Sequence, residues 1–184
     1  MAVSKPVLVL IDVVAWGLIH TVTGYVVHKM PARAFEQNKG IWKERTFERN
    51  GRLWVRLGVL RWKKWLPEAG DFFTGGFNKS KIPSRAEEGL RLYARETRRA
   101  ELGHWLAGGF APLFFLWNPW YGAVPMLFYA VAVNGPCVVS QRYNRIRIMR
   151  VLALRSRSPR ASRLSPPEGG RPARGTSAAQ PPTP

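Results

Sequence analysis

Three long apolar runs, separated by charged stretches, dominate the pattern of hydrophobic and polar positions along the chain. They cover residues 7–28, 102–118 and 120–140. A helix that crosses a bilayer needs about 20 mostly apolar residues, which the first and third runs supply. The second run is shorter, and we expect it to borrow residues from the charged segment before it. The pattern predicts an all-α integral membrane protein with about three transmembrane helices.

The first apolar run must be distinguished from a secretory signal peptide. Only Lys5 precedes it, and no small-residue cleavage site follows it before the sequence HKMPARAF. We therefore interpret residues 7–28 as a retained membrane span.

Two basic amphipathic segments are expected to lie on the membrane surface. In GRLWVRLGVLRWKKWLPEAG, Leu53, Leu57 and Leu60 recur at helical spacing among Trp and basic residues. Trp rings favour the headgroup region, and Lys or Arg side chains reach lipid phosphates from there. The stretch QRYNRIRIMRVLALR, after the third run, has the same character. Both segments are predicted to be interfacial helices.

The rest of the chain divides into a structured loop and a tail. Residues 29–101 form a long loop. Its end and the start of the second apolar run, SRAEEGLRLYARETRRAELGHW, are predicted to form a helix with a capping box of Ser84 and Glu87. From residue 156 onward the chain consists mainly of Pro, Ser, Arg and Gly, and such a segment cannot bury enough apolar surface to fold. We therefore expect one domain over 1–155 and a disordered tail over 156–184.

The charge balance indicates which partners to expect. The formal net charge is +18, from 29 Lys and Arg against 11 Asp and Glu, which is typical of proteins that bind nucleic acid or anionic membranes. The apolar runs favour a bilayer with anionic lipids over nucleic acid. The loop over residues 29–99 holds 18 Lys or Arg, and the link between the second and third runs holds none. Because positive loops stay inside, we expect a multi-pass cell-membrane protein with its N-terminus outside and its C-terminus in the cytoplasm.

The sequence ETRRAELGHW places an acid and a histidine where a charged segment meets an apolar one. Glu101 and His104 are three residues apart, so they share one face of a helix. A carboxylate beside an imidazole is suited to general-base catalysis. An interfacial histidine that only hydrogen-bonds a loop explains the pattern equally well. Three histidines and the single Cys137 are too few for a Cys-based zinc site or for the histidine boxes of a membrane di-iron enzyme, so no metal is expected.

Other polar residues at the predicted cytoplasmic ends of the spans could complete a site. Arginine can grip a phosphate or carboxylate with two donors and stabilise an oxyanion, although each arginine could equally be a positive-inside anchor. The candidate substrate-binding residues are Arg142, Gln141, Asn144, Lys63, Lys64 and Trp62. Within the spans, we expect Asp12 and Asn134 to make hydrogen bonds between helices.

Four stretches carry a resemblance to a known family: RWKKWLPEAGDFFTGGFNK, ETRRAELGHW, LWNP and FYAVAVNGPCVVSQRYNRIR. In this order they resemble the glycosyl-4,4'-diaponeurosporenoate acyltransferases of staphyloxanthin-type carotenoid biosynthesis, over about residues 51–152. The resemblance implies a transferase that esterifies the primary sugar hydroxyl of a glycosylated carotenoid, or a similar glycolipid, with a fatty acyl group. It implies an acyl thioester, acyl-CoA or acyl-carrier protein, as co-substrate and no tightly bound cofactor. Partners would be the glycosyl carotenoid and could include other enzymes of carotenoid synthesis.

Within that expectation, His104 is the hypothetical base, Glu101 orients it, and Arg142, Lys63 or Lys64 holds the donor or the oxyanion. The chain has no Gly-x-Ser-x-Gly elbow, which favours direct transfer from the thioester over a serine intermediate. The alternative is a non-catalytic membrane protein that binds anionic lipid or scaffolds pathway enzymes through its basic helices.

Overall fold

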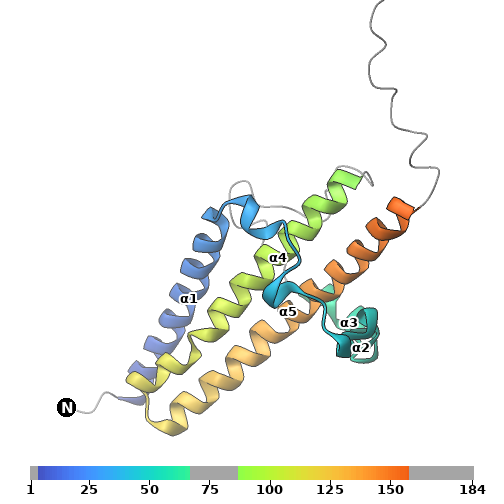
Figure 1. The fold of residues 1–184 in the computed structure, drawn as a ribbon. Coiled ribbons are helices and arrows are strands. Elements are labelled where there is room, and N and C mark those ends of the chain that lie inside the picture. The colour runs from blue at the N-terminus through green and yellow to red at the C-terminus, as the bar shows by residue number, and fades with distance from the viewer. Residues whose placement is uncertain (1–3, 67–86, 158–184) are drawn as a thin grey trace, which may run out of the picture.

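The computed structural model describes residues 4–66 and 87–157. Within these residues the chain is helical and contains no strand, as the all-α prediction requires. Three long helices form the body of the molecule (Figure 1): α1 Lys5–Lys29, α4 Glu87–Gly109 and α5 Trp120–Arg157. α4 packs against both α1 and α5 and runs antiparallel to them.

This antiparallel order gives the bundle one polar and one apolar end. At the polar end, Nη1 of Arg99 on α4 donates a hydrogen bond to the backbone carbonyl of His28, in the last turn of α1, at 2.6 Å. At the apolar end, Trp16 stacks on Phe114, with 4.8 Å between the ring centroids. The middle of α4, at Arg99, therefore lies beside the last turn of α1, while α1 meets η7 through aromatic side chains at the apolar end.

Over residues 30–66, the described part of the chain between α1 and α4, the structure forms short helical turns rather than one interfacial helix. Gly58, at a left-handed φ of 73°, separates α2 from α3, because glycine adopts this conformation without steric cost. The single helix predicted after Gly51 is therefore divided into three pieces. The turns are η1 Ala32–Phe35, η2 Gly40–Trp42, η3 Thr46–Gly51, α2 Arg52–Arg56, α3 Val59–Trp62 and η4 Lys63–Trp65.

The second apolar run does not continue as one helix. α4 ends at Gly109, and the chain goes on as the 3-10 helix η7, Ala111–Leu116, with Pro112 near its start. Among the described residues, two helices, α1 and α5, are long and apolar enough to cross a membrane. The first and third predicted spans therefore correspond to suitable helices, whereas the count of three spans is not confirmed.

α5 joins the third predicted span and the basic segment after it into one helix. Its 38 residues correspond to about 57 Å at a rise of 1.5 Å per residue, whereas the hydrocarbon core of a bilayer is about 30 Å thick. A bilayer that covers its apolar first half leaves its arginine-rich second half outside. The helix extends to Arg157, so it includes the first two residues of the predicted tail, and the rest of that tail lies outside the described residues. Ser84, the first residue of the predicted capping box, also lies outside the described residues.

At the apolar end, polar side chains are buried and large apolar side chains are exposed, which is the reverse of the pattern in a water-soluble helical bundle. The side chains of Asp12 and Asn134 are buried, whereas Val13 is 64% exposed and Phe128 is 72% exposed. Large exposed apolar surfaces of this kind mark contact with lipid or with another protein. Such surfaces on the two helices that are long enough to span agree with a membrane location.

Asp12 fastens α1 to the connection between η7 and α5. Its Oδ1 accepts hydrogen bonds from Nε1 of Trp117 at 2.9 Å and from Nδ2 of Asn118 at 2.7 Å. A buried carboxylate needs such donors, because water is excluded. Asp12 is therefore hydrogen-bonded to another part of the bundle, as expected, but its partners lie in a connection and not within a second helix.

Candidate functional site

Glu101 is the centre of a buried ionic cluster between α4 and α5. Its side chain is fully buried, and its Oε1 accepts a hydrogen bond from Nη1 of Arg142 at 2.8 Å. Its Oε2 accepts a short hydrogen bond from Nη1 of Arg145. Nε1 of Trp105, one turn along α4, also donates to Oε1 at 3.3 Å. Because both oxygens of Glu101 are engaged, the carboxylate joins the two helices.

Arg142 makes five hydrogen bonds, one for each of its N–H donors. Two go to Oε1 and Oε2 of Glu48, at 2.9 and 2.8 Å, and one goes to Glu101. The other two go to the backbone carbonyls of Ile41, at 2.6 Å, and Lys43, at 3.1 Å. Since every donor is engaged within the protein, Arg142 joins η3 and the segment before it to α4 and α5. Its contact with the acyl donor stays a prediction.

Arg145 and the nearby Arg98 also donate to backbone carbonyls of the irregular segment from η1 to η3. Nη1 of Arg98 donates to the carbonyl of Phe35 at 2.8 Å, and Nη2 of Arg145 donates to the carbonyl of Trp42 at 3.2 Å. In return, Nε1 of Trp42 donates to the carbonyl of Arg98 at 3.2 Å. A buried carbonyl without a helical partner needs a donor, and here guanidinium groups provide it. The cluster thus holds this segment against α4 and α5.

Glu48 is a member of the cluster that the sequence pattern did not reveal. Burial opposes its ionisation, but hydrogen bonds from Arg142 and from the backbone N–H of Arg45 outweigh burial, so the pKa of Glu48 lies below its usual value. Burial, together with the positive charge of Arg145, lowers the pKa of Arg98 to about 10, which still leaves it cationic at neutral pH. The sequence around Glu48, which forms the 3-10 helix η3, has no periodic pattern, so no sequence signal linked Glu48 to a partner 94 residues away.

His104 pairs with Asn134 across the interface between α4 and α5. Its Nδ1 lies 3.1 Å from Oδ1 of Asn134. Nδ2 of Asn134 donates to the backbone carbonyl of Ala130 at 3.0 Å, which fixes the orientation of the amide, because a carbonyl only accepts. Oδ1 therefore accepts from Nδ1–H of His104, which in the neutral imidazole leaves the lone pair on Nε2. This is the tautomer that a general base needs.

Asn134 thus makes the hydrogen bond to His104 that the sequence pattern predicted for Glu101. Both carboxylate oxygens of Glu101 are held by Arg142, Arg145 and Trp105, whereas the described hydrogen bond of His104 goes to Asn134. The helical spacing of Glu101 and His104 is correct, since both lie on α4. Spacing alone could not show that the arginines of α5 occupy the carboxylate.

Gln141 lies two turns after Asn134 on α5, and residues seven apart share a helix face. Gln141 is buried, and within the described part of the chain its Oε1 has no hydrogen-bond partner. An unsatisfied buried acceptor is costly, so it requires an explanation. It is an acceptor that could serve a ligand hydroxyl.

The remaining predicted site residues lie on α3, η4 and α5. Nζ of Lys63 donates to Oδ1 of Asn144 at 3.2 Å, which joins η4 to α5. Nε1 of Trp62 donates to the carbonyl of Leu57 at 3.0 Å, and Nζ of Lys64 lies 5.4 Å from the ring centroid of Trp65. Lys63 and Asn144 therefore meet as a pair, whereas the described contacts of Trp62 and Lys64 are local.

The fold and the cluster define a small helical protein with two helices suited to a membrane and a buried polar network between α4 and α5. Residues 33–154 match the family model described as glycosyl-4,4'-diaponeurosporenoate acyltransferase. The chain belongs to this family, and so to the acyltransferases.

Curated relatives with the same name support this assignment. The chain is 30% identical over 142 residues to the glycosyl-4,4'-diaponeurosporenoate acyltransferase of Staphylococcus haemolyticus, covering 76% of this chain and 82% of the relative. It is 26% identical over 144 residues to the proteins of that name from Staphylococcus aureus strains bovine RF122 / ET3-1 and USA300, covering 77% of this chain and 86% of each relative. No solved structure matches the chain.

Proposed function

We propose that this protein is a membrane-bound O-acyltransferase that transfers a fatty acyl group to the primary sugar hydroxyl of a glycosylated carotenoid or a similar glycolipid. The family membership supports acyl transfer, and the relatives carry the name of a glycosyl carotenoid acyltransferase. The observation that carries the proposal is the hydrogen bond from His104 to Asn134, because it directs the lone pair of the imidazole to Nε2.

In the proposed reaction His104 is the general base and Asn134 orients it. Nε2 takes the proton of the sugar hydroxyl while the hydroxyl oxygen forms a bond to the carbonyl carbon of an acyl thioester. The tetrahedral intermediate collapses, the C–S bond breaks, and the leaving thiolate takes the proton from the imidazolium. The products are a sugar ester and a free thiol. A positioned general base of this kind contributes about 10²–10⁴ in rate.

Gln141 is the proposed contact to the acceptor sugar. A hydroxyl of the sugar would donate to its otherwise unsatisfied Oε1. We place Gln141 beside His104 in function because it lies on the face of α5 that also carries Asn134. Lys63, Lys64, Trp62 and Asn144 lie on η4 or its neighbours and are proposed to lie near the acyl donor.

The apolar end of the bundle supports the proposed membrane placement. α1 and the first half of α5 would lie in the bilayer, with the ionic cluster at its inner surface. In this placement the N-terminus is outside and the C-terminus inside, because the basic residues gather at the polar end. The polyene of a carotenoid would lie in the hydrocarbon, and its sugar would meet His104 at the boundary.

The direct test is ester formation by the purified full chain in nanodiscs, given a glycosylated carotenoid and a fatty acyl thioester. We expect the wild type to form the ester and His104→Ala to lose most of this activity, as measured by mass spectrometry of the pigment. The matched control is His20→Ala, which removes an imidazole that stacks on Trp16 in α1. Equal ester formation by His104→Ala and wild type would remove His104 from the reaction. A folded wild type that forms no ester from any thioester tested would point instead to the non-catalytic alternative.

A further inference from the structure

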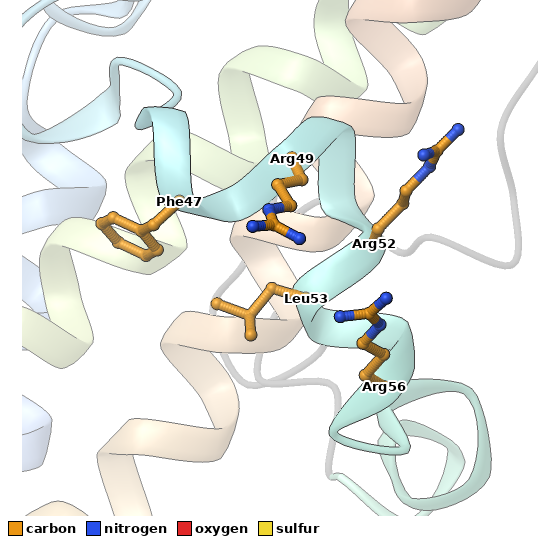
Figure 2. A pocket seen from close by; sticks show the side chains of 5 residues that line it. All are labelled: Phe47, Arg49, Arg52, Leu53 and Arg56. Atoms are coloured by element: carbon orange, nitrogen blue, oxygen red, sulfur yellow. The ribbon is translucent and has the colours of Figure 1, made fainter.

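A hollow of about 350 Å³ opens at the surface formed by η3 and α2. Figure 2 shows its five lining side chains. Arg49 and Arg56 reach toward the side on which Leu53 lies, whereas Arg52 extends away from it; Phe47 lies at the other edge. The hollow therefore combines two converging cations with apolar side chains.

The charge of these arginines is not balanced within the described part of the chain. Arg49, Arg52 and Arg56 are exposed, and no hydrogen bond or ion pair there engages their side chains. The neighbouring acid, Glu48, is fully buried and paired with Arg142. The guanidinium groups of Arg142 and Arg145 in the ionic cluster, by contrast, donate hydrogen bonds to carboxylates and carbonyls. The guanidinium groups of the hollow remain available to an anion.

The backbone beneath the hollow is held in an uncommon conformation. Arg49 has a φ of 46° and Asn50 a φ of 59°, both in the left-handed region that residues other than glycine seldom adopt. Nη2 of Arg150 on α5 donates to the carbonyl of Asn50 at 2.6 Å, and Nε1 of Trp54 donates to Glu48 at 3.1 Å. Such strain persists where the surroundings enforce it, and it gathers at binding sites. The hollow is thus attached firmly to α5 and to the ionic cluster.

We propose that this hollow binds a phosphate ester that carries an apolar group. The phosphate lies between Arg49 and Arg56, since the planar guanidinium matches two phosphate oxygens at once. The apolar group lies against Phe47 and Leu53. Two molecules carry this chemistry at a membrane: an anionic phospholipid, through its headgroup, and coenzyme A in an acyl-CoA donor. Binding of acyl-CoA in the hollow rests on the proposed function, whereas binding of a phosphate ester there does not.

The test measures binding rather than turnover, so its failure is distinct from failure of the acyltransferase proposal. The full chain is placed in phosphatidylcholine nanodiscs, and coenzyme A is titrated by calorimetry. In a second arm, binding of the detergent-solubilised chain to phosphatidylglycerol vesicles is compared with binding to phosphatidylcholine vesicles. Wild type is compared with Arg49→Gln/Arg56→Gln. The matched control is Arg33→Gln/Arg61→Gln, which removes the same charge from exposed positions outside the hollow.

We expect the double variant in the hollow to bind about tenfold more weakly, or worse, in one of the two arms, while the control binds as the wild type does. Loss of coenzyme A binding assigns the hollow to the acyl donor, and loss restricted to phosphatidylglycerol vesicles assigns it to a lipid headgroup. Equal binding by wild type and the variant in both arms overturns the proposal. An equal loss in the control also overturns it, because the effect would then be one of total charge.

Discussion

Nδ1 of His104 on α4 lies 3.1 Å from Oδ1 of Asn134 on α5. Because the amide of Asn134 is fixed by the carbonyl of Ala130, the hydrogen bond determines which ring nitrogen of His104 carries the proton. The tautomer of the proposed base is therefore set by the packing of two helices. A second-helix residue that orients a catalytic histidine is a positioning residue, and its loss should affect the rate more than substrate binding.

Asn134→Ala tests this role. We expect kcat for ester formation to fall by about 10–100-fold with little change in the KM of the acyl thioester, because the imidazole loses its orientation but remains present. Asn118→Ala is the matched control, since it removes a buried amide that hydrogen-bonds Asp12 instead of His104. Activity is measured per folded molecule. A rate for Asn134→Ala equal to that of the control would show that Asn134 only packs.

Periodicity and composition predicted the parts of the fold that they encode directly. The apolar run over residues 7–28 is a helix, and so are the charged segment before His104 and the run over residues 120–140. The pattern did not predict where helices end, because a single backbone conformation can interrupt a helix. Gly58, in a left-handed conformation, divides the segment expected to be one interfacial helix. At Gly109 α4 ends, so the second apolar run is not one helix.

The sequence pattern singled out residues of the ionic cluster and of the His104–Asn134 pair, but it did not predict which of them contact one another. His104, Glu101 and Arg142 make contacts between α4 and α5, and Gln141 is buried on α5. Several of the partners of these residues come from distant parts of the chain. Glu48 engages Arg142 across 94 residues, and no local spacing predicts a contact of that range. A sequence shows which side chains can ionise, whereas only the packing shows which of them neutralise each other.

Gln141→Leu separates a structural from a binding role for Gln141. Its Oε1 is buried without a partner in the described residues, so an apolar side chain of similar size should stabilise the protein by about 1 kcal/mol. If the sugar hydroxyl donates to Oε1, the same change should raise the KM for the glycoside about tenfold. Thermal unfolding and steady-state kinetics measure the two effects. A more stable variant with an unchanged KM would exclude Gln141 from the acceptor site.

Glu101→Gln tests whether Glu101 is structural or catalytic. The change leaves Arg142 and Arg145 with less negative charge in a buried place, so we expect a loss of about 3–5 kcal/mol in the free energy of unfolding. Glu96→Gln is the control, because its ion pair with Arg99 is partly exposed and should contribute under about 1 kcal/mol. Denaturant unfolding gives both values. We expect the activity per folded molecule of Glu101→Gln to stay near that of wild type; a loss comparable to that of His104→Ala would return Glu101 to the catalytic group.

The lowered pKa of Glu48 makes the stability of the protein depend on pH in the acid range. The unfolded chain binds a proton at Glu48 near pH 4.5, whereas the folded protein binds it only at lower pH. The stabilisation is therefore complete above about pH 4.5 and is lost as the pH falls through the folded pKa, with a slope of at most about 1.4 kcal/mol per pH unit. Thermal unfolding between about pH 3 and 7 should show this decline for wild type and a weaker one for Glu48→Gln. Glu36→Gln, at an exposed position, is the control and should follow the wild type.

Asp12 should control how firmly α1 is held to the rest of the bundle. Asp12→Leu removes the acceptor for Trp117 and Asn118 and leaves two buried donors unsatisfied, so we expect a loss of about 2–5 kcal/mol in the free energy of unfolding. Asp12→Asn keeps an amide oxygen at the same place and should recover most of that loss. The two variants differ little in size, and unfolding in detergent, followed by Trp fluorescence, compares them. If both are equally unstable, the negative charge of Asp12 matters more than its acceptor, and the fastening of α1 must be attributed to electrostatics instead of these two hydrogen bonds.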